Sequence, residues 1–241
     1  MEKSLPISAV IMAGGKGKRL APLTNTVPKP LLKIGDKTII EWVIELLLEH
    51  RISDISVSTC YLSDSVVAFF ENHSKYSFIK ILHEDLPMGD IGILGKMPSD
   101  YWQNEDILVI NTDLFTDINL TTFYDHFLES QTELIIATFI HRNQIPWGIL
   151  KKTEKFVTHI QEKPIVEMEA NAGIYLFKKP ILALIPVNDF FQAWRLINRI
   201  LEEKHYKITT FPICGTWVDI GTKKNYLYAQ SLAKRLSQSI L

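Results

Sequence analysis

The segment from residue 12 to residue 24 concentrates glycine and basic residues directly after an apolar run. It reads Met-Ala-Gly-Gly-Lys-Gly-Lys-Arg-Leu-Ala-Pro-Leu-Thr. Glycines let backbone N–H groups come close to a polyphosphate, and lysine and arginine side chains add positive charge. We therefore predict a phosphate-binding loop, whose contacts we assign to Ala13, Gly14, Gly15, Gly17, Lys18 and Arg19.

Taken alone, this loop is also compatible with a simple glycine turn that carries solvated charges. It lacks the Gly-Lys-Ser/Thr ending of a P-loop and the spaced glycines of dinucleotide folds. The next motif along the chain favours the phosphate interpretation, because Lys29 stands between Pro28 and Pro30. Proline fixes the local backbone, so the Lys29 ammonium is held in place and suits a phosphate contact.

Two carboxylates follow short apolar segments that are typical of buried strands. Asp113 comes shortly after Ile-Leu-Val-Ile at residues 107–110, and Asp219 lies between Val218 and Ile220. Each alone could cap a turn, as we expect for nearby Asp117. As a pair at strand ends they suit Mg²⁺, which takes one or two carboxylates and completes its shell with phosphate oxygens and water. We predict a magnesium site at Asp113 and Asp219.

The elements that must position these residues alternate along the chain. Apolar runs predict strands at residues 7–12, 55–59, 78–82, 107–110, 134–141 and 208–212, and shorter β-segments at 147–151, 157–161, 171–177 and 216–220. Helical spacing predicts helices at 38–50, 64–71 with Ser63 as the N-cap, 91–96, 121–130, 180–185, 191–204 and 223–237. Strands separated by helices predict an α/β fold, with a mostly parallel mixed sheet flanked by helices. No linker or repeat divides the 241 residues, so we expect a single domain whose second half adds a small substrate-binding lobe.

Composition narrows the function classes. The net charge is −1, which gives no general reason to expect nucleic-acid binding. No apolar run approaches the roughly 20 residues that a membrane helix needs. The two cysteines imply no disulfide framework. We therefore expect a cytoplasmic protein with small-molecule substrates.

Together these motifs resemble the sugar-phosphate nucleotidylyltransferases, or NDP-sugar pyrophosphorylases. That family opens with Gly-Gly-x-Gly-Thr-Arg-Leu-x-Pro-Leu-Thr and then Pro-Lys-Pro, and this chain has Gly-Gly-Lys-Gly-Lys-Arg-Leu-Ala-Pro-Leu-Thr at 14–24 and Pro-Lys-Pro at 28–30. Leu-Pro-Met-Gly at 86–89 resembles the base-reading loop, and Asn-Thr-Asp at 111–113 resembles the first metal motif. Glu-Lys-Pro at 162–164, Asn-Ala-Gly-Ile-Tyr at 171–175 and Trp-Val-Asp-Ile-Gly at 217–221 resemble the sugar-side and second metal motifs. The stretch 171–221 is similar to the guanylyltransferase-type branch.

The resemblance implies a Rossmann-like, glycosyltransferase-A-like nucleotidyltransferase fold. It also implies that NTP and a sugar 1-phosphate react to give an NDP-sugar and pyrophosphate with Mg²⁺. Transferred residue by residue, it assigns catalytic roles to Arg19, Lys29 and Lys163, base contacts to Glu84 and Gly89, nucleotide and metal contacts to Asp113, and sugar contacts to Glu162, Asn171 and Gly173. It further implies that residues 1–241 form one nucleotidyltransferase domain, with a nucleotide-binding N-terminal part and a sugar-binding C-terminal part. A homo-oligomer is left open.

The base preference is inferred from Glu84. Several relatives have glutamine there, which both donates and accepts hydrogen bonds, whereas ionised glutamate only accepts. An acceptor suits the adjacent N1–H and N2–H₂ donors of guanine, so we expect GTP, with dTTP, UTP or CTP as alternatives.

The chain also departs from the family pattern at Lys18, Thr112, Asp90 and Gln192, which leaves a non-catalytic nucleotide-sugar-binding homologue as an alternative. A kinase or a glycosyltransferase is less favoured, because the P-loop Lys-Ser and Asp-x-Asp motifs are absent.

Overall fold

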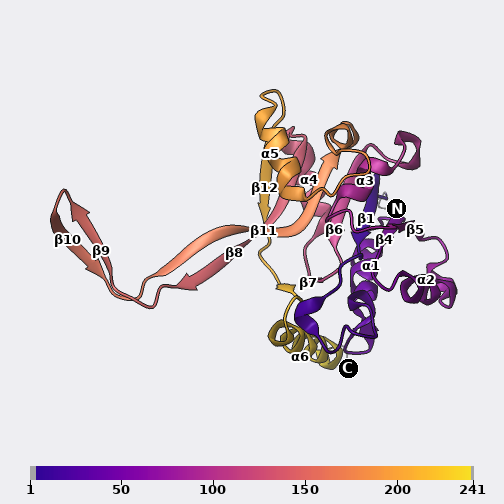
Figure 1. The fold of residues 1–241 in the computed structure, drawn as a ribbon, viewed down its shortest axis with the longest axis horizontal. Coiled ribbons are helices and arrows are strands. Elements are labelled where there is room, and N and C mark those ends of the chain that lie inside the picture. The colour runs from indigo at the N-terminus through magenta and orange to yellow at the C-terminus, as the bar shows by residue number, and fades with distance from the viewer. Residues whose placement is uncertain (1–3, 240–241) are drawn as a thin grey trace.

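A seven-stranded sheet forms the centre of the molecule in the computed structural model, which describes residues 4–239 (Figure 1). The strand order is β12-β8-β11-β6-β1-β4-β5. One half of the sheet is parallel and consists of β1 (Ile7–Met12), β4 (Asp54–Thr59), β5 (Lys80–His83) and β6 (Asp106–Asn111). Their apolar side chains are almost all buried, as expected for parallel strands covered on both faces.

The other half of the sheet is mixed. β11 (Ile165–Lys178) runs antiparallel to both β6 and β8 (Leu134–Gln144), while β12 (Ile208–Pro212) runs parallel to β8. The α/β class and the mostly parallel mixed sheet predicted from the sequence are thereby confirmed.

Two apolar layers cover the faces of this sheet. One layer contains α1 (Ile39–Glu49), α2 (Ser63–Glu71) and α4 (Leu120–Ser130). The other contains α3 (Gly92–Lys96) and α5 (Ala193–Glu202). A third, smaller cluster joins α6 (Lys223–Ser239) to the paired strands β7 (Leu114–Thr116) and β13 (Trp217–Asp219) and to the hairpin of β2 (Lys33–Ile34) and β3 (Lys37–Thr38). Short 3-10 turns are η1 (Lys18–Leu20), η2 (Lys29–Leu31), η3 (Ser74–Tyr76), η4 (Ser99–Tyr101) and η5 (Lys179–Leu184).

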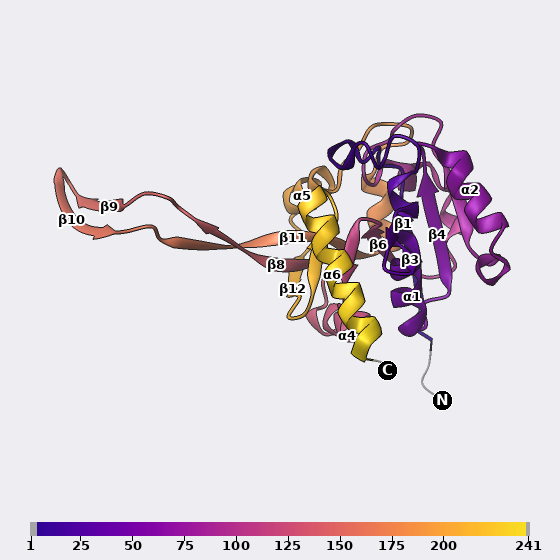
Figure 2. The ribbon, with the colours of Figure 1, turned by 90° about the horizontal axis from the view of Figure 1, so that it is seen from below.

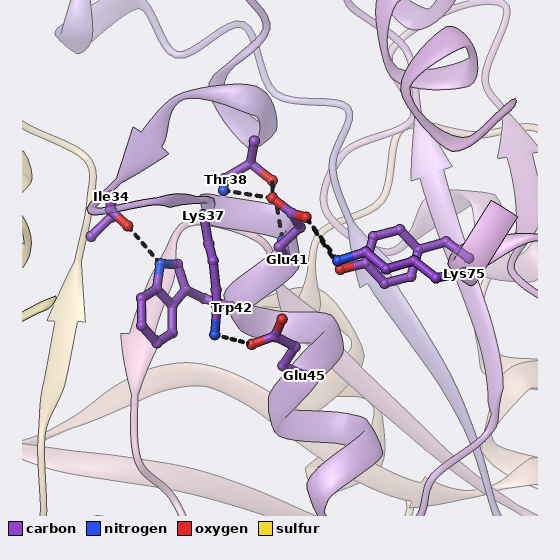
Figure 3. Close-up of polar contacts among 8 residues, drawn as sticks. Ile34, Lys37, Thr38, Glu41, Trp42, Glu45 and Lys75 are labelled. Carbon is purple, nitrogen blue, oxygen red and sulfur yellow. Dashed lines mark hydrogen bonds and ion pairs between the residues drawn. The ribbon is translucent and has the colours of Figure 1, made fainter. Parts of the chain in front are cut away.

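Side-chain contacts fix where α1 begins (Figure 3). Thr38 accepts a hydrogen bond from the Glu41 backbone N–H, and the Glu41 carboxylate accepts one from the Thr38 backbone N–H at 2.8 Å. This reciprocal capping box satisfies donors that an open helix end leaves free. Trp42 donates to the Ile34 carbonyl at 2.9 Å, which joins the helix to the β2–β3 hairpin.

A long ribbon, here called the arm, projects from the body of the molecule (Figures 1 and 2). It comprises residues 139–170: the outer parts of β8 and β11, and between them the hairpin of β9 (Ile149–Thr153) and β10 (Phe156–Gln161). Most of its side chains are exposed. The sequence predicted the β-segments here but gave no sign that they leave the body.

The predicted elements agree with the structure in type more often than in extent. β11 begins at residue 165, six residues earlier than the predicted segment, and residues 180–185 lie mainly in the 3-10 turn η5 instead of an α-helix. The prediction that Ser63 is the N-cap of α2 is wrong. Leu62 takes the cap position, and the Ser63 hydroxyl bonds to Thr59 and His83. Across the described residues, no helix combines the length and apolarity needed to cross a membrane.

Candidate active site

A cavity of about 560 Å³ opens at the carboxyl ends of β1 and β6. Its lining includes the glycine-rich loop after β1, the segment around Glu84 and Gly89, and Asn111 and Asp113 after β6. Parallel α/β sheets bind ligands at this edge, because the loops of adjacent strands meet there. The volume is in the range of ordinary small-molecule sites.

The glycine-rich loop is held by the end of its own motif. The Thr24 hydroxyl donates to the Gly17 carbonyl at 3.0 Å, and the Leu20 N–H donates to the same oxygen at 2.9 Å. Thr24 and Leu20 are buried, whereas Gly15, Lys18 and Arg19 are exposed. The loop therefore has a fixed base and an open, positively charged rim, which is the arrangement that a phosphate-binding loop needs.

Lys29 lies under this rim and pairs with Asp113. Its ammonium Nζ is 2.5 Å from the Asp113 Oδ2, and its side chain is only 10% exposed. Pro30 forms the first turn of η2 with Lys29, and Pro28 precedes it in an extended conformation. Two prolines and a 3-10 turn thus aim one buried cation at the end of β6. The phosphate contact predicted for this lysine stays a prediction.

Asp219 lies beside Asp113 because β13 pairs with β7. Asp219 is opposite Leu114 in that pair, and the Ile220 N–H donates to the Asp113 carbonyl at 2.7 Å. Burial raises the pKa of Asp219, and the Asp113 carboxylate raises it further, while Lys29 and Arg19 act in the opposite direction. A guanidinium nitrogen of Arg19 is 4.0 Å from the Asp219 Oδ2.

This carboxylate pair fits a hard divalent cation. Asp113 and Asp219 are partly exposed, at 30% and 35% of their side chains, and a cation between them would offset the repulsion of their like charges. Within residues 4–239, no group of three or more His, Cys, Asp or Glu side chains forms a cation cage. Two carboxylates with room for phosphate oxygens match Mg²⁺, which rarely uses an all-protein cage.

Glu84 and Gly89 are among the residues that line this cavity. Glu84 is 4% exposed, and its carboxylate accepts hydrogen bonds from the Ser58 hydroxyl and, at 3.0 Å, from the Met88 N–H. Gly89 has φ +89°, and a Cβ there would lie 2.2 Å from the Phe191 carbonyl oxygen. Only glycine fits this close approach between the loop and the start of α5.

A second cavity of about 360 Å³ adjoins the first and holds the predicted sugar contacts Asn171 and Gly173. Arg19, Asn111 and Asp113 line both cavities. Asn171 accepts from the Gly173 N–H at 2.8 Å and donates to the Tyr175 hydroxyl at 2.7 Å. Gly173 has φ +75°, and a Cβ would lie 2.6 Å from the Asn111 side-chain nitrogen. The asparagine and the glycine thus form one turn that shapes the cavity wall.

The structure does not bring Glu162 and Lys163 to these cavities. Both lie on the arm, between β10 and β11, and are exposed. Their assigned contacts with sugar and sugar phosphate stay predictions.

The sequence of the chain is similar to those of known proteins. The sequence model of the family described as nucleotidyl transferase matches residues 8–235. The chain belongs to that family. It is 29% identical to a UTP–glucose-1-phosphate uridylyltransferase of Synechocystis, over 92% of this chain and 62% of the relative. It is also 29% identical to a mannose-1-phosphate guanyltransferase of Saccharomyces cerevisiae, over 95% of this chain and 66% of the relative.

Solved structures agree with this membership at the level of fold. HddC from Yersinia pseudotuberculosis has a TM-score of 0.73 and 23% identity, covering 94% of this chain and 99% of that protein. A second structure of HddC, with GMP-PN, has a TM-score of 0.72. By contrast, this nucleotidyl transferase chain spans about three fifths to two thirds of the length of the curated relatives above.

The departures from the family pattern have structural partners in this nucleotidyl transferase. The Asp90 carboxylate accepts from the Ala193 N–H at 2.7 Å, at the first residue of α5. Thr112 is buried and donates to the Met12 carbonyl at 2.5 Å, which ties β6 to β1. Gln192 is the N-cap residue of α5 and accepts from the Trp194 indole at 3.2 Å. The Asp117 carboxylate accepts from the Thr216 N–H at 2.7 Å and so joins the ends of β7 and β13, instead of capping a local turn as we expected.

Sequence reasoning gave no role to several residues that line the site, among them the following four. Asn111 lines both cavities, Tyr175 and Trp217 line the second, and Gly221 leaves the space that Arg19 occupies. Burial raises the pKa of Tyr175 to about 12, so its hydroxyl stays protonated at neutral pH. All four lie inside motifs that were identified from the sequence. Their place in those motifs was therefore the available signal.

Proposed function

We propose that this nucleotidyl transferase moves a nucleoside monophosphate from an NTP to a sugar 1-phosphate and releases pyrophosphate. The observation that carries the proposal is the junction of the two cavities. Arg19, Asn111 and Asp113 line both, and the Lys29 ammonium and the Asp219 carboxylate both lie against Asp113 or beside it. One cavity is suited to the nucleotide and the other to the sugar phosphate, so their reacting phosphates would meet at this junction.

The chain's own groups suit a reaction that must bring two anions together. An oxygen of the sugar phosphate attacks the α-phosphorus of the NTP, and the bond to the pyrophosphate leaving group breaks. Positioning and charge stabilisation supply most of the catalysis in such transfers. We assign the leaving pyrophosphate to the backbone N–H groups of residues 13–17 and to Arg19, and the transferred phosphate to Lys29.

We propose Mg²⁺ as the cofactor, held by Asp113 and Asp219. When bound, the ion would offset the negative charge of the two phosphates. The place of the two carboxylates supports this assignment, because both line the smaller cavity and Asp113 also lines the larger one. An ion held there would supply positive charge near the junction where the two phosphates are proposed to meet.

We propose GTP as the favoured nucleotide, because Glu84 lines the larger cavity and accepts hydrogen bonds. Glu162 and Lys163 are retained as proposed contacts of the sugar phosphate. The remaining proposals are a cytoplasmic enzyme of polysaccharide precursor synthesis, with no nucleic-acid or membrane partner. The near-neutral net charge of −1 supports the proposal that the protein has no nucleic-acid partner.

The test is a pyrophosphate-release screen of all NTPs against a panel of sugar 1-phosphates, with and without Mg²⁺. We expect turnover with at least one pair, dependent on Mg²⁺ and lost on chelation. Asp113→Asn should abolish the turnover, while the exposed Asp36→Asn should not. Binding of nucleotide without turnover for any pair would favour the non-catalytic homologue and refute the proposal.

A further inference from the structure

The arm exposes an unusual number of large apolar side chains. Of the 23 large apolar residues that are exposed among the described residues, ten lie on the arm. They are Ile140, Trp147, Ile149, Leu150, Phe156, Val157, Ile160, Ile165, Val166 and Met168. A two-stranded ribbon is marginally stable alone in water. The arm therefore needs a surface to cover it, and its own body does not provide one.

Both edges of the arm's inner half are open. Residues 139–144 of β8 and 165–170 of β11 pair with each other. β12 stops pairing with β8 at Thr138, and β6 pairs with β11 only from Ile174 onward. Open strand edges carry unpaired backbone donors and acceptors, which pair readily with another chain.

The middle of the arm carries a set of residues suited to a sugar phosphate. Lys163 has φ +44°, a strained conformation for a residue with a side chain. The Glu162 carboxylate lies over Gly148, where a Cβ would be 2.8 Å from it, and Trp147 is the next residue. Neither Lys163 nor Glu162 forms a hydrogen bond or ion pair with any residue in the described part of the chain. Backbone strain of this kind concentrates at functional sites.

This set cannot reach the cavity of its own subunit without breaking the arm. Lys163 is eight residues from Asn171, which is about 26 Å along a strand at a rise of about 3.3 Å per residue. The intervening residues 165–171 form a continuous ladder with 138–144. Folding back would break that ladder, whereas reaching outward leaves it intact.

The smaller cavity, here called the sugar-side cavity, has more acidic than basic side chains in its lining. The sugar-side cavity is lined by one basic residue, Arg19, and two acidic ones, Asp113 and Asp219. The outer arm, residues 149–163, holds four lysines and two glutamates. A basic segment from outside would therefore complement both the carboxylates and an anionic sugar phosphate.

We propose that the arm reaches a second copy of this chain and places Trp147, Glu162 and Lys163 at the sugar-side cavity of that copy. In a dimer with two-fold symmetry, the distance from the first body to the second equals the distance back. One arm length therefore lets each arm lie across to the body of the other copy. The open edges of the two arms then pair with each other between the bodies. The identity of the bound group rests on the proposed function.

The mass of the protein tests the exchange without any reaction. Sedimentation equilibrium should give twice the 27.7 kDa mass of the chain. A variant with residues 140–169 replaced by Asn-Gly, which joins the paired residues Phe139 and Ala170, should be a folded monomer. Circular dichroism confirms that the shortened variant is folded. A monomeric full-length protein, or a folded dimer without the arm, overturns the proposal.

Mixed dimers test whether Lys163 acts on the other subunit. Two tags allow purification of a dimer with Arg19→Ala in one chain and Lys163→Ala in the other. If Lys163 acts across the interface, one of the two sites is whole and activity is about half of wild type, whereas action within the chain leaves both sites damaged. The matched control pairs a chain carrying both substitutions with an unmodified chain, and there the expected results are reversed: activity is lost if Lys163 acts across the interface. The opposite pattern, or equal loss in both mixed dimers, refutes the proposal.

These outcomes separate the two proposals. An unmodified protein that is inactive in the substrate screen and remains a dimer only with its arm contradicts the proposed function but supports the exchange. An active enzyme with the reversed mixed-dimer pattern supports the function but not the exchange.

Discussion

The Lys29 ammonium is the buried charge on which the proposed chemistry most depends. Its contact with Asp113 is short and its neighbours Pro28 and Pro30 limit its movement. A side chain that contacts Asp113 only part of the time would therefore not substitute for Lys29.

Lys29→Met should lower kcat by about 10²–10³-fold, the scale seen when one preorganised donor to a developing charge is removed. Methionine keeps the apolar stem, so the change in free energy of unfolding should be smaller than the loss of activity suggests. The kinetic constants and a urea titration measure both effects. The exposed Lys33→Met is the matched control and should change neither. Normal kcat in Lys29→Met would refute the assignment.

Glu84→Gln tests the base preference. Glutamine keeps an acceptor for the Met88 N–H but adds a donor that guanine cannot accept on its N1–H and N2–H₂ side. The ratio of kcat/KM for GTP over UTP should fall by about tenfold or more, as a mismatched buried hydrogen bond to a charged group costs that much. Glu105→Gln, an exposed carboxylate-to-amide change, is the control. An unchanged ratio in Glu84→Gln would rule out this role.

The start of α5 contacts two residues, Gly89 and Asp90, of the loop that contains the Leu-Pro-Met-Gly motif. Gly89 lies against the Phe191 backbone, and Asp90 accepts from the Ala193 N–H. A loop residue thus caps a helix that is a hundred residues away in the chain, which places the cavity wall and α5 in a fixed relation.

Gly89→Ala should destabilise the protein markedly, because alanine at φ +89° is strained by about 1–2 kcal/mol and its Cβ would overlap the Phe191 carbonyl. The loop should also move and weaken nucleotide binding. Thermal unfolding and nucleotide titration measure the two effects. Gly15→Ala is the matched control, since no atom lies within 4 Å of its Cβ position, and its stability should stay within about 0.5 kcal/mol of wild type. Equal stability of the two variants would contradict the close approach.

Asp90 gives a prediction for pH dependence. Burial raises the pKa of Asp90, although the Ala193 N–H acts in the opposite direction. The folded state therefore holds the Asp90 proton more tightly than the unfolded state, so its contribution to stability is present at low pH and is lost as pH rises through its folded pKa. In Asp90→Asn that loss cannot occur, so the stability of the variant relative to wild type should increase as pH rises from about 4 to 7. Urea unfolding at several pH values measures this difference, and a flat profile would contradict the burial effect.

The sequence predicted most helices and strands in type, and it placed the phosphate loop, Lys29, Asp113 and Asp219 near one sheet edge. It could do so because strand ends of a parallel sheet meet, and the apolar runs show where those ends are. The structure adds contacts between residues that are far apart in the sequence, which the types of single residues do not predict. Asp90 and Ala193 are close only because the start of α5 packs against the loop, and the spacing of residues along the chain contains no sign of this contact.

The arm shows a different limit of sequence reasoning. Its alternating residues predict strands, and the structure has strands there. Whether a strand pair packs on its own body or extends away depends on which partner covers it, and a single sequence does not state the partner. For this reason Lys163, which the sequence placed with the site, lies instead on the arm.

At the scale of the whole molecule, the arm contributes little to the stability of the body. Residues 140–169 supply no side chain to the buried clusters, which are built from the sheet and the helices. Replacing residues 140–169 by Asn-Gly should therefore leave the free energy of unfolding of the isolated subunit within about 1 kcal/mol of the wild-type subunit, because only surface side chains are removed. Urea unfolding at low protein concentration, where only the subunit is populated, measures it. A larger loss would show that the arm is part of the body's core.

Trp217 and Phe139 are stacked at the arm's root, with ring centroids 3.7 Å apart. Phe139 is the residue where β8 leaves the body, and Trp217 is two residues before Asp219 on β13. The indole also donates to the Ala172 carbonyl at 2.9 Å, on the neighbouring strand β11. Any change in the direction of the arm therefore changes the surroundings of the Trp217 indole, a natural fluorophore near the carboxylates of the site. The fluorescence emission of Trp217 should thus report the position of the arm.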